Sequence, residues 1–144
     1  MLTPLDGSEL GESALPYAIE ICKKTGATLY VLHIISHAYH IVGGSAQKLQ
    51  HELLQILHSQ AVEYLESVSL RLKNEGIAFK SELITGYPSV TIIEFAKANN
   101  MDLIAMSSHG QSGIDRFVMG STTDKVIHNS EHPVLLVRVK PGKK

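Results

Sequence analysis

Short apolar runs alternate along the chain with longer stretches in which apolar residues recur every three or four positions. The short runs have the length of strands, and they occupy residues 1–5, 27–35, 77–84, 101–106 and 134–139. The intervening stretches have helical spacing, and they occupy about 10–25, 47–74, 88–99 and 121–129. Gly26 and Gly76 follow the last apolar positions of two of these stretches, where glycine commonly ends a helix.

The alternation of strands and helices predicts an α/β domain. Short strands that are apolar on both faces pair in parallel, with right-handed crossovers and helices on both sides of the sheet. The chain has 144 residues, enough for one domain with a sizeable core, and it has no internal repeat. We therefore expect one domain over residues 1–140, followed by a basic tail at 141–144.

Composition and charge exclude several classes of protein. The chain is 44% hydrophobic and its net charge is −1 with neutral histidines, so no basic field attracts nucleic acid or anionic lipid. No apolar stretch approaches the ~20 residues of a membrane span, and the first residues do not resemble a signal peptide. The single cysteine, Cys22, can form no internal disulfide, which favours a reducing compartment. We expect a cytoplasmic protein without nucleic-acid or membrane partners.

One connector is rich in glycine and hydroxyl side chains. Residues 107–122 read SSHGQSGIDRFVMGST and join the strand predicted at 101–106 to a helix. Ligands of open parallel sheets bind beyond the carboxyl ends of the strands, where the strand order reverses. The sequence therefore predicts a pocket between this connector and residues 3–7, which follow the first strand.

The chemistry of these two segments suits a nucleotide. Free amides and the helix dipole favour phosphate at the start of the last helix, near Gly120, Ser121, Thr122 and Thr123. Asp6, on the opposite side of the crevice, would repel phosphate but can accept hydrogen bonds from ribose hydroxyls. A tight turn with an ordinary helix cap explains Gly120 and Ser121 equally well, so the two interpretations stay open at this point.

The chain lacks the two commoner nucleotide-binding motifs, G-x-x-x-x-G-K-[ST] and G-x-G-x-x-G. It carries a different pattern, in which S-S-H-G at residues 107–110 is followed by nine residues and then by Gly120-Ser121. Around it stand T-P-L-D-G-S, V-L-H-I, G-Y-P, D-L-I-A-M-S-S-H-G and H-P-V-L-L-V, in this order. Over nearly its whole length the sequence resembles the ATP-binding branch of the universal stress protein family.

The resemblance implies a Rossmann-like domain of the adenine nucleotide alpha hydrolase type, with strand order 3-2-1-4-5. It implies ATP as the ligand, with the adenosine half near Pro4 and Asp6 and the adenine edge at the main chain of Ile34. The ribose would lie beside Met106 and Ser107. The complete implied set of binding residues is Pro4, Asp6, Ile34, Met106, Ser107, His109, Gly110, Gln111, Ser112, Gly113, Gly120, Ser121, Thr122 and Thr123.

Two further points concern the implied ligand. Such families often bind a divalent ion with the triphosphate, so Mg²⁺ is an implied companion of ATP, although no carboxylate cluster in the sequence independently requires it. The motif's first glycine is Ser107 here, and a serine Cβ at this position is expected to crowd the ribose.

Histidine and serine residues raise two other possibilities. The chain has eight histidines, but no spacing typical of a metal site accompanies them, and we interpret them as structural or solvent-facing. His33 is expected on a strand beside the pocket. Ser108, His109 and Asp6 supply the residue types of a hydrolase, but adjacent serine and histidine side chains rarely face one another, and no nucleophile-elbow motif is present. Cys22 is expected to be an inert buried thiol.

We therefore expect a nucleotide-responsive regulatory or binding protein of the stress response, with no catalytic residues and no protein-held metal. One alternative is a slow ATPase or a hydrolase of adenylated phosphates, and another is a nucleotide-free dimeric scaffold. A homodimer is expected through residues 134–139, because this final strand lies at a sheet edge in the implied order and an uncovered apolar edge invites association. Its aliphatic residues are Val134, Leu135, Leu136, Val137 and Val139.

Overall fold

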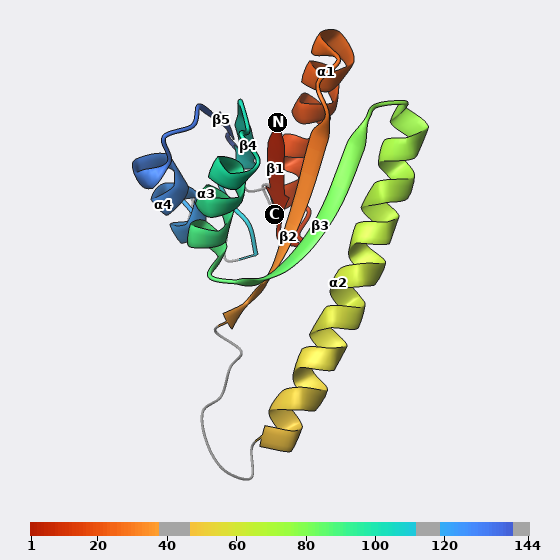
Figure 1. Ribbon diagram of the computed structural model, residues 1–144, viewed down its shortest axis with the longest axis vertical. Helices are drawn as coiled ribbons and strands as arrows, with labels where there is room; N and C mark the ends of the chain where they lie inside the picture. Colours follow the sequence, from red (N-terminus) through yellow and green to blue (C-terminus); the bar gives the residue numbers. More distant parts are fainter. Residues whose placement is uncertain (38–46, 112–118, 140–144) are drawn as a thin grey trace, which may run out of the picture.

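The computed structural model describes residues 1–37, 47–111 and 119–139, in which five parallel strands form one sheet in the order β3-β2-β1-β4-β5 (Figure 1). The strands are β1 Leu2–Leu5, β2 Leu29–Ser36, β3 Phe79–Gly86, β4 Ile104–Ser107 and β5 Val134–Val137. The helices are the 3-10 turn η1 Gly11–Ala14, α1 Leu15–Thr25, α2 Gln47–Glu75, α3 Pro88–Ala98 and α4 Ser121–Asn129. The predicted fold class and strand order are confirmed.

Several strand boundaries differ from the sequence prediction, and backbone hydrogen bonds explain two of them. The predicted start of β4 at Met101 is wrong, because the N–H of Met101 donates to Ala96 O at 2.9 Å and so belongs to the end of α3. The predicted end of β5 at Val139 is also wrong, because the N–H of Val139 donates to Ser108 Oγ at 3.1 Å rather than to a neighbouring strand. β2 and β3 each begin two residues later than predicted, and β3 continues to Gly86.

The first helical segment begins as a 3-10 turn. Ser8 supports this turn, since its Oγ accepts the N–H of Gly11 at 2.9 Å, whereas Ser13 instead donates to Leu10 O at 2.7 Å. Ser8 therefore satisfies a backbone donor at the start of the helical segment, and Ser13 does not. Gly26 ends α1 with a φ of 71°, in the left-handed region where glycine carries no steric penalty.

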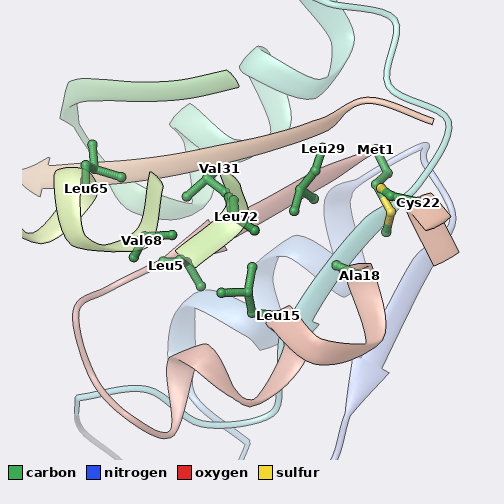
Figure 2. Close-up of a cluster of buried hydrophobic side chains, with 11 residues drawn as sticks. Met1, Leu5, Leu15, Ala18, Cys22, Leu29, Val31, Leu65, Val68 and Leu72 are labelled. Atoms are coloured by element: carbon green, nitrogen blue, oxygen red, sulfur yellow. The ribbon is translucent and has the colours of Figure 1, made fainter. Parts of the chain in front are cut away.

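The sheet separates two apolar cores, one on each face. The first lies under α1 and α2 (Figure 2), and its central members are Leu5, Leu15, Leu29, Val31, Leu65, Val68 and Leu72. The second lies under α3 and α4 and contains Leu2, Leu32, Ile92, Ala96, Ile104, Met106 and Val126. Val31 and Leu32 are fully buried on opposite faces of β2, as the continuous apolar run of this interior strand predicts.

Helix α2 is longer than the sheet that it covers. At 29 residues it spans roughly 44 Å, whereas the eight residues of β2 span roughly 26 Å. Its core contacts come from the second half, in which Leu65, Val68 and Leu72 are buried. Of the apolar stripe expected along the helix, Leu49 and Ile56 are more than half exposed. The first half of α2 therefore extends beyond the carboxyl edge of the sheet (Figure 1).

Candidate functional site

A pocket of about 540 Å³ lies at the carboxyl ends of β1, β2 and β4. Of the fourteen residues that the sequence pointed to, Ser112 and Gly113 lie outside the described residues. The other twelve all line this pocket: Pro4, Asp6, Ile34, Met106, Ser107, His109, Gly110, Gln111, Gly120, Ser121, Thr122 and Thr123. The fold thus brings together residues from the ends of β1, β2 and β4 and from the start of α4.

Asp6 connects the loop after β1 to the loop after β4. Its Oδ1 accepts the N–H and the hydroxyl of Ser8, at 3.0 and 2.7 Å, and its Oδ2 accepts the N–H of Gln111 at 2.7 Å. The side-chain amide of Gln111 donates back to Asp6 O at 2.5 Å. A carboxylate offers about four acceptor positions, so these three bonds leave about one acceptor position on Asp6 for a ligand.

Two glycines make room for this carboxylate. A Cβ at Gly110 would overlap Oδ2 of Asp6, and a Cβ at Gly11 would overlap Oδ1. Neither glycine has a positive φ, so close approach rather than backbone conformation requires the missing side chain. The second glycine of the sequence motif therefore accommodates Asp6 in this chain.

Ser107, which replaces the first glycine of the motif, shapes the loop with its hydroxyl. Its Oγ donates to His109 O at 2.6 Å and accepts the N–H of His109 at 3.2 Å. The side chain is buried, and its carbonyl accepts the hydroxyl of Thr123 at 2.9 Å. Consequently the hydroxyl of Thr123 is used inside the protein, and only its backbone N–H remains as a ligand contact in the predicted phosphate site.

The amino end of α4 forms one end of the pocket. Gly120 is the N-cap, and among the described residues no side-chain hydrogen bond caps the helix. Because the first amides of a helix have no partner within it, the N–H groups that begin at Ser121 face the ligand side with the positive end of the helix dipole. The exposed hydroxyl of Ser121 adds a donor without adding charge. This arrangement suits an anion such as phosphate.

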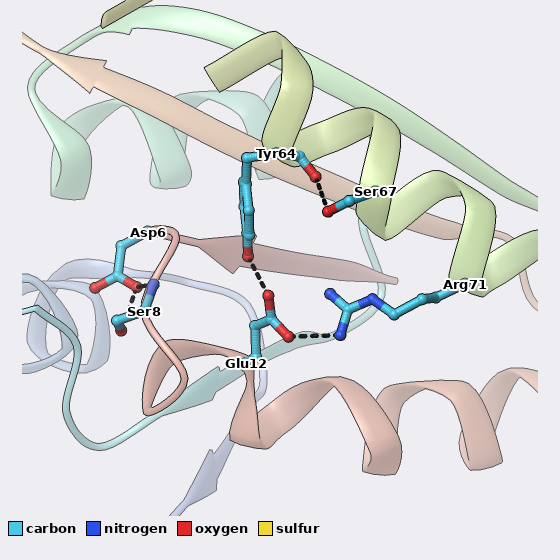
Figure 3. Close-up of polar contacts among 6 residues, drawn as sticks. All are labelled: Asp6, Ser8, Glu12, Tyr64, Ser67 and Arg71. Carbon is cyan, nitrogen blue, oxygen red and sulfur yellow. Dashed lines mark hydrogen bonds and ion pairs between the residues drawn. The ribbon is translucent and has the colours of Figure 1, made fainter. Parts of the chain in front are cut away.

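At the other end of the pocket hydrogen bonds connect η1 to α2 (Figure 3), and a ring contact connects α2 to β2. The ring centroids of His33 and Tyr64 lie 5.3 Å apart, and the hydroxyl of Tyr64 donates to Glu12 Oε1 at 2.9 Å. Arg71 donates to the other oxygen of Glu12 at 2.8 Å. The bond from Arg71 lowers the pKa of Glu12, whereas burial raises the pKa of Tyr64 and lowers the pKa of His33.

Apolar side chains from α2 and α3 complete the walls, and sequence reasoning missed them. They come with one polar side chain, and the set is Leu57, Gln60, Ala61, Tyr64, Pro88 and Ile92. The length of α2 is the signal that could have revealed them. A helix that is longer than the strands it covers has to project past one edge of the sheet, where it can form a wall of the pocket. An apolar wall at this end and free amides at α4 fit a ligand with a flat apolar part and an anionic part.

Ser108 and His109 do face one another, contrary to the sequence-based expectation, with Ser108 Oγ 2.9 Å from His109 Nδ1. The same Oγ accepts the N–H of Val139. Ser108 is buried, and among the described residues it is not part of the pocket lining. The pair therefore fastens the loop to the end of β5 and does not present a nucleophile to the pocket.

The described residues contain no group of three or more His, Cys, Asp or Glu side chains placed to bind a metal ion. His51 and His58 lie exposed on α2, and Cys22 is buried in the first core, where burial raises its pKa. No helix in the described part of the chain is both long enough and apolar enough to cross a membrane.

A comparison with models of protein families identifies the family of this chain. The model of the universal stress protein family matches residues 1–138. The chain belongs to the universal stress protein family. Among curated relatives, the universal stress protein MJ0531 of Methanocaldococcus jannaschii is 32% identical over 143 residues, which cover 99% of this chain and 83% of the relative.

Solved structures of universal stress proteins have the same fold. The structure of MJ0577 from Methanocaldococcus jannaschii superimposes with a TM-score of 0.86 at 29% identity and covers 98% of this chain and 96% of its own. A universal stress protein in complex with cAMP superimposes with a TM-score of 0.70 at 20% identity, covering 95% of this chain and 94% of its own. The second comparison extends the likeness of the fold to a distant relative.

Proposed function

We propose that this universal stress protein binds an adenine nucleotide, ATP in the first instance, at the carboxyl edge of its sheet. It acts as a nucleotide-responsive binding protein in the stress response, and any hydrolysis is slow and incidental. The observation that carries the proposal is the convergence of the twelve described candidate residues, from four separate segments, on one pocket. The relative crystallised with cAMP indicates that an adenine nucleotide is compatible with this fold.

The two ends of the pocket support one orientation of the proposed nucleotide. The phosphates lie at the start of α4, where the backbone N–H groups and the hydroxyls of Ser121 and Thr122 are available as donors. The ribose lies beside Asp6, which keeps one acceptor position open. The base extends toward the apolar walls at Ile34 and Ala61. The residues present therefore fit the nucleotide, and a Mg²⁺ ion would depend on the phosphates for its ligands.

The hydrogen bonds that the reactive side chains already make within the protein favour binding over catalysis. A hydrolase needs a nucleophile or an activated water next to a base. The Ser108 hydroxyl is held by Val139 and His109, and the Asp6 carboxylate is held by Ser8 and Gln111. Incubation with ATP and Mg²⁺ measures this directly: we expect less than one ADP or AMP per protein within minutes, and sustained turnover would identify an enzyme.

The binding site is tested by substitution at Gly120. Its φ of −55° and ψ of 138° are accessible to any residue, and a Cβ there would have its nearest neighbours at 3.5 to 3.9 Å. Gly120→Ala therefore serves as a matched control that retains binding. Gly120→Val adds two methyl groups at the place where phosphate approaches, and we expect ATP affinity to fall by about tenfold or more, about 1.4 kcal/mol.

Calorimetry with ATP measures these affinities, and circular dichroism verifies the fold of each variant. Mass spectrometry of ligand released from freshly purified protein identifies the nucleotide carried from the cell. Unchanged ATP affinity in a folded Gly120→Val protein would place the site elsewhere. Release of a ligand without an adenine ring would overturn the assignment of the nucleotide.

A further inference from the structure

Strand β3 lies beside β2 at one end of the sheet, and its outer edge is open (Figure 1). In the described part of the chain β3 pairs only with β2, along all eight of its residues. The carbonyl of Ala78, just before the strand, accepts the N–H of Leu29 from β2 at 2.9 Å. Successive residues of a strand direct their main-chain groups to opposite sides. The residues that direct theirs to the open edge are therefore Phe79, Ser81, Leu83 and Thr85.

A groove of about 440 Å³ lies between the second half of β3 and α3. Its floor is apolar, because Ile84 and Phe95 pack against the second core. Two further apolar side chains face solvent at the groove, where Tyr87 is 65% exposed and Val90 is 49% exposed. The ring of Tyr87 packs against His37, with the ring centroids 5.2 Å apart. Among the described residues none lines both this groove and the nucleotide pocket, so the two sites are separate.

Exposed carboxylates accompany the apolar surface. Glu94 of α3 is the one acidic residue among the described residues that line the groove. Glu82 lies two positions before Ile84 on β3 and therefore on the same face of the strand. No ion pair in the described part of the chain neutralises either carboxylate. The neighbouring Lys80 lies over an aromatic ring, with its Nζ 5.2 Å from the ring centroid of Tyr30. This surface therefore favours a basic side chain next to an apolar one.

We propose that the open edge of β3 and this groove form a docking site for an extended peptide segment of a partner protein. The segment adds to the sheet as a further strand and pairs with the main-chain groups of Ser81, Leu83 and Thr85. The residue opposite Ile84 places an apolar side chain in the groove. The residue opposite Glu82, two positions away on the same face, is Lys or Arg. The site thus selects an apolar and a basic residue separated by one position in an extended chain.

A partner segment fits this edge better than a second copy of the chain. The homodimer expected through β5 uses the opposite edge of the sheet. If two copies paired at β3 as well, dimers would join edge to edge without limit, as in fibrous assemblies. A short segment of another protein covers the edge and ends the association.

The experiment selects ligands for the full chain from a displayed library of random nine-residue peptides. Sequencing of the bound clones should show enrichment of an apolar residue and a Lys or Arg two positions apart. The most enriched peptides are then synthesised, and fluorescence anisotropy measures their affinities. Replacing the basic residue of such a peptide by Glu, or the apolar residue by Gly, should weaken binding by about tenfold.

A proline variant relates this binding to the open edge. Thr85→Pro removes an N–H from the edge, where proline is tolerated, and should weaken the binding of the selected peptides by at least about tenfold. Thr85→Ala is the matched control, because it keeps the N–H, and its affinity should stay within about twofold of the wild type. Circular dichroism verifies the fold of each variant.

A charge reversal tests the two carboxylates. In a protein that carries both Glu82→Lys and Glu94→Lys, peptides with Glu in place of the basic residue should bind more tightly than the originally selected peptides. A loss of folding cannot produce such a gain of affinity, so this result would support the docking site directly.

Three results would overturn the inference. The first is a selection that enriches no pattern of an apolar and a basic residue. The second is a folded Thr85→Pro protein that binds the selected peptides as tightly as the wild type does. The third is a wild-type chain that sediments as assemblies larger than a dimer and that Thr85→Pro reduces in size, because the occupant of the edge would then be a second copy. Each of these results would leave the proposed nucleotide binding standing.

Discussion

The carboxylate of Asp6 accepts the backbone N–H of Gln111 at 2.7 Å, although 105 positions separate the two residues in the chain. This bond joins the loop after β1 to the loop after β4 at the edge of the pocket. It also gives Asp6 a structural role in addition to the proposed contact with ribose. The two glycines that flank the carboxylate, Gly11 and Gly110, belong to the same arrangement.

Gly110→Ala is predicted to act through Asp6. The added Cβ would overlap Oδ2 of Asp6, so the carboxylate has to move and the bond to Gln111 is lost. We expect ATP to bind more weakly, by ~1–3 kcal/mol, the usual range for losing a charged hydrogen-bond partner. Calorimetry on the folded variant measures this loss.

A double-mutant cycle separates this mechanism from a direct effect of Gly110 on the ligand. In an Asp6→Ala background the carboxylate is absent, so Gly110→Ala should cost much less than it does in the wild type. Strictly additive losses of ATP affinity would mean that Gly110 acts on the nucleotide itself.

Much of the fold could be predicted from the sequence because the signal is local. The continuous apolar run at β2 and the left-handed position of Gly26 depend only on neighbouring residues. The end of β4 and the start of α4 could be located in the same way. Boundaries such as the start of β4 could not be located in this way, because the N–H of Met101 donates to a carbonyl at the end of α3.

The candidate site could likewise be predicted only where the signal is local in the sequence. The glycine and hydroxyl pattern identifies the loops that converge on the pocket, but it does not reveal how Asp6, Gly11 and Gly110 fit together. That fit arises from close approach in space, for which the sequence spacing holds no signal. The wall that α2 contributes through Tyr64 was missed for a related reason, because its place depends on where the helix projects past the sheet.

The Glu12 carboxylate is predicted to stabilise the fold in a pH-dependent way. Its folded-state pKa lies below the ordinary value of a glutamate, chiefly because Arg71 donates a hydrogen bond to it. A depressed carboxylate pKa contributes stability above the unfolded pKa, and this stability is lost as the pH falls through the folded-state value. Since Arg71 is about half exposed, we expect Glu12→Gln to lower the free energy of unfolding by only about 0.5–1 kcal/mol at pH 7.

Urea denaturation between pH 3 and pH 7 measures this difference. The difference between the wild type and Glu12→Gln should shrink as the pH falls below the ordinary glutamate pKa and toward the lower folded-state value. Glu75→Gln, in the exposed pair with Lys23, is the matched control and should show little change at any pH. A difference at pH 7 that persists undiminished at pH 3 would contradict the electrostatic origin.

Thr3→Val is predicted to stabilise the protein. Thr3 is fully buried at the centre of β1, and its Oγ1 has no hydrogen-bond partner among the described residues. An unsatisfied buried hydroxyl costs ~1–3 kcal/mol, and valine fills nearly the same volume without it. Thermal and urea unfolding should show a gain of about 1 kcal/mol.

Thr123 provides the matched comparison for this prediction. It is also buried, but its hydroxyl donates to Ser107 O at 2.9 Å. The same Thr→Val change should therefore destabilise the protein at position 123, because it leaves the Ser107 carbonyl without this donor. Stability changes of the same sign at both positions would show that hydrogen bonding does not decide the outcome.

The outer edge of β5 is predicted to join two chains in a homodimer. In the described part of the chain β5 pairs only with β4, and its four residues, all aliphatic, are half-buried. On the side of β4, the carbonyl of Pro133 accepts the N–H of Ile104, and the carbonyl of Val137 accepts the N–H of Ser108. Because successive residues of a strand direct their polar groups to opposite sides, Val134 and Leu136 direct theirs to the open edge.

This alternation makes the dimer testable with two proline variants. Leu136→Pro removes a donor from the open edge, where proline is tolerated, so the chain should fold and sediment as a monomer. Leu135→Pro removes a donor from the ladder with β4 and should destabilise the fold itself. Sedimentation at tens of micromolar distinguishes these cases. If the wild type is monomeric, or if a folded Leu136→Pro protein still dimerises, the association does not run through this edge.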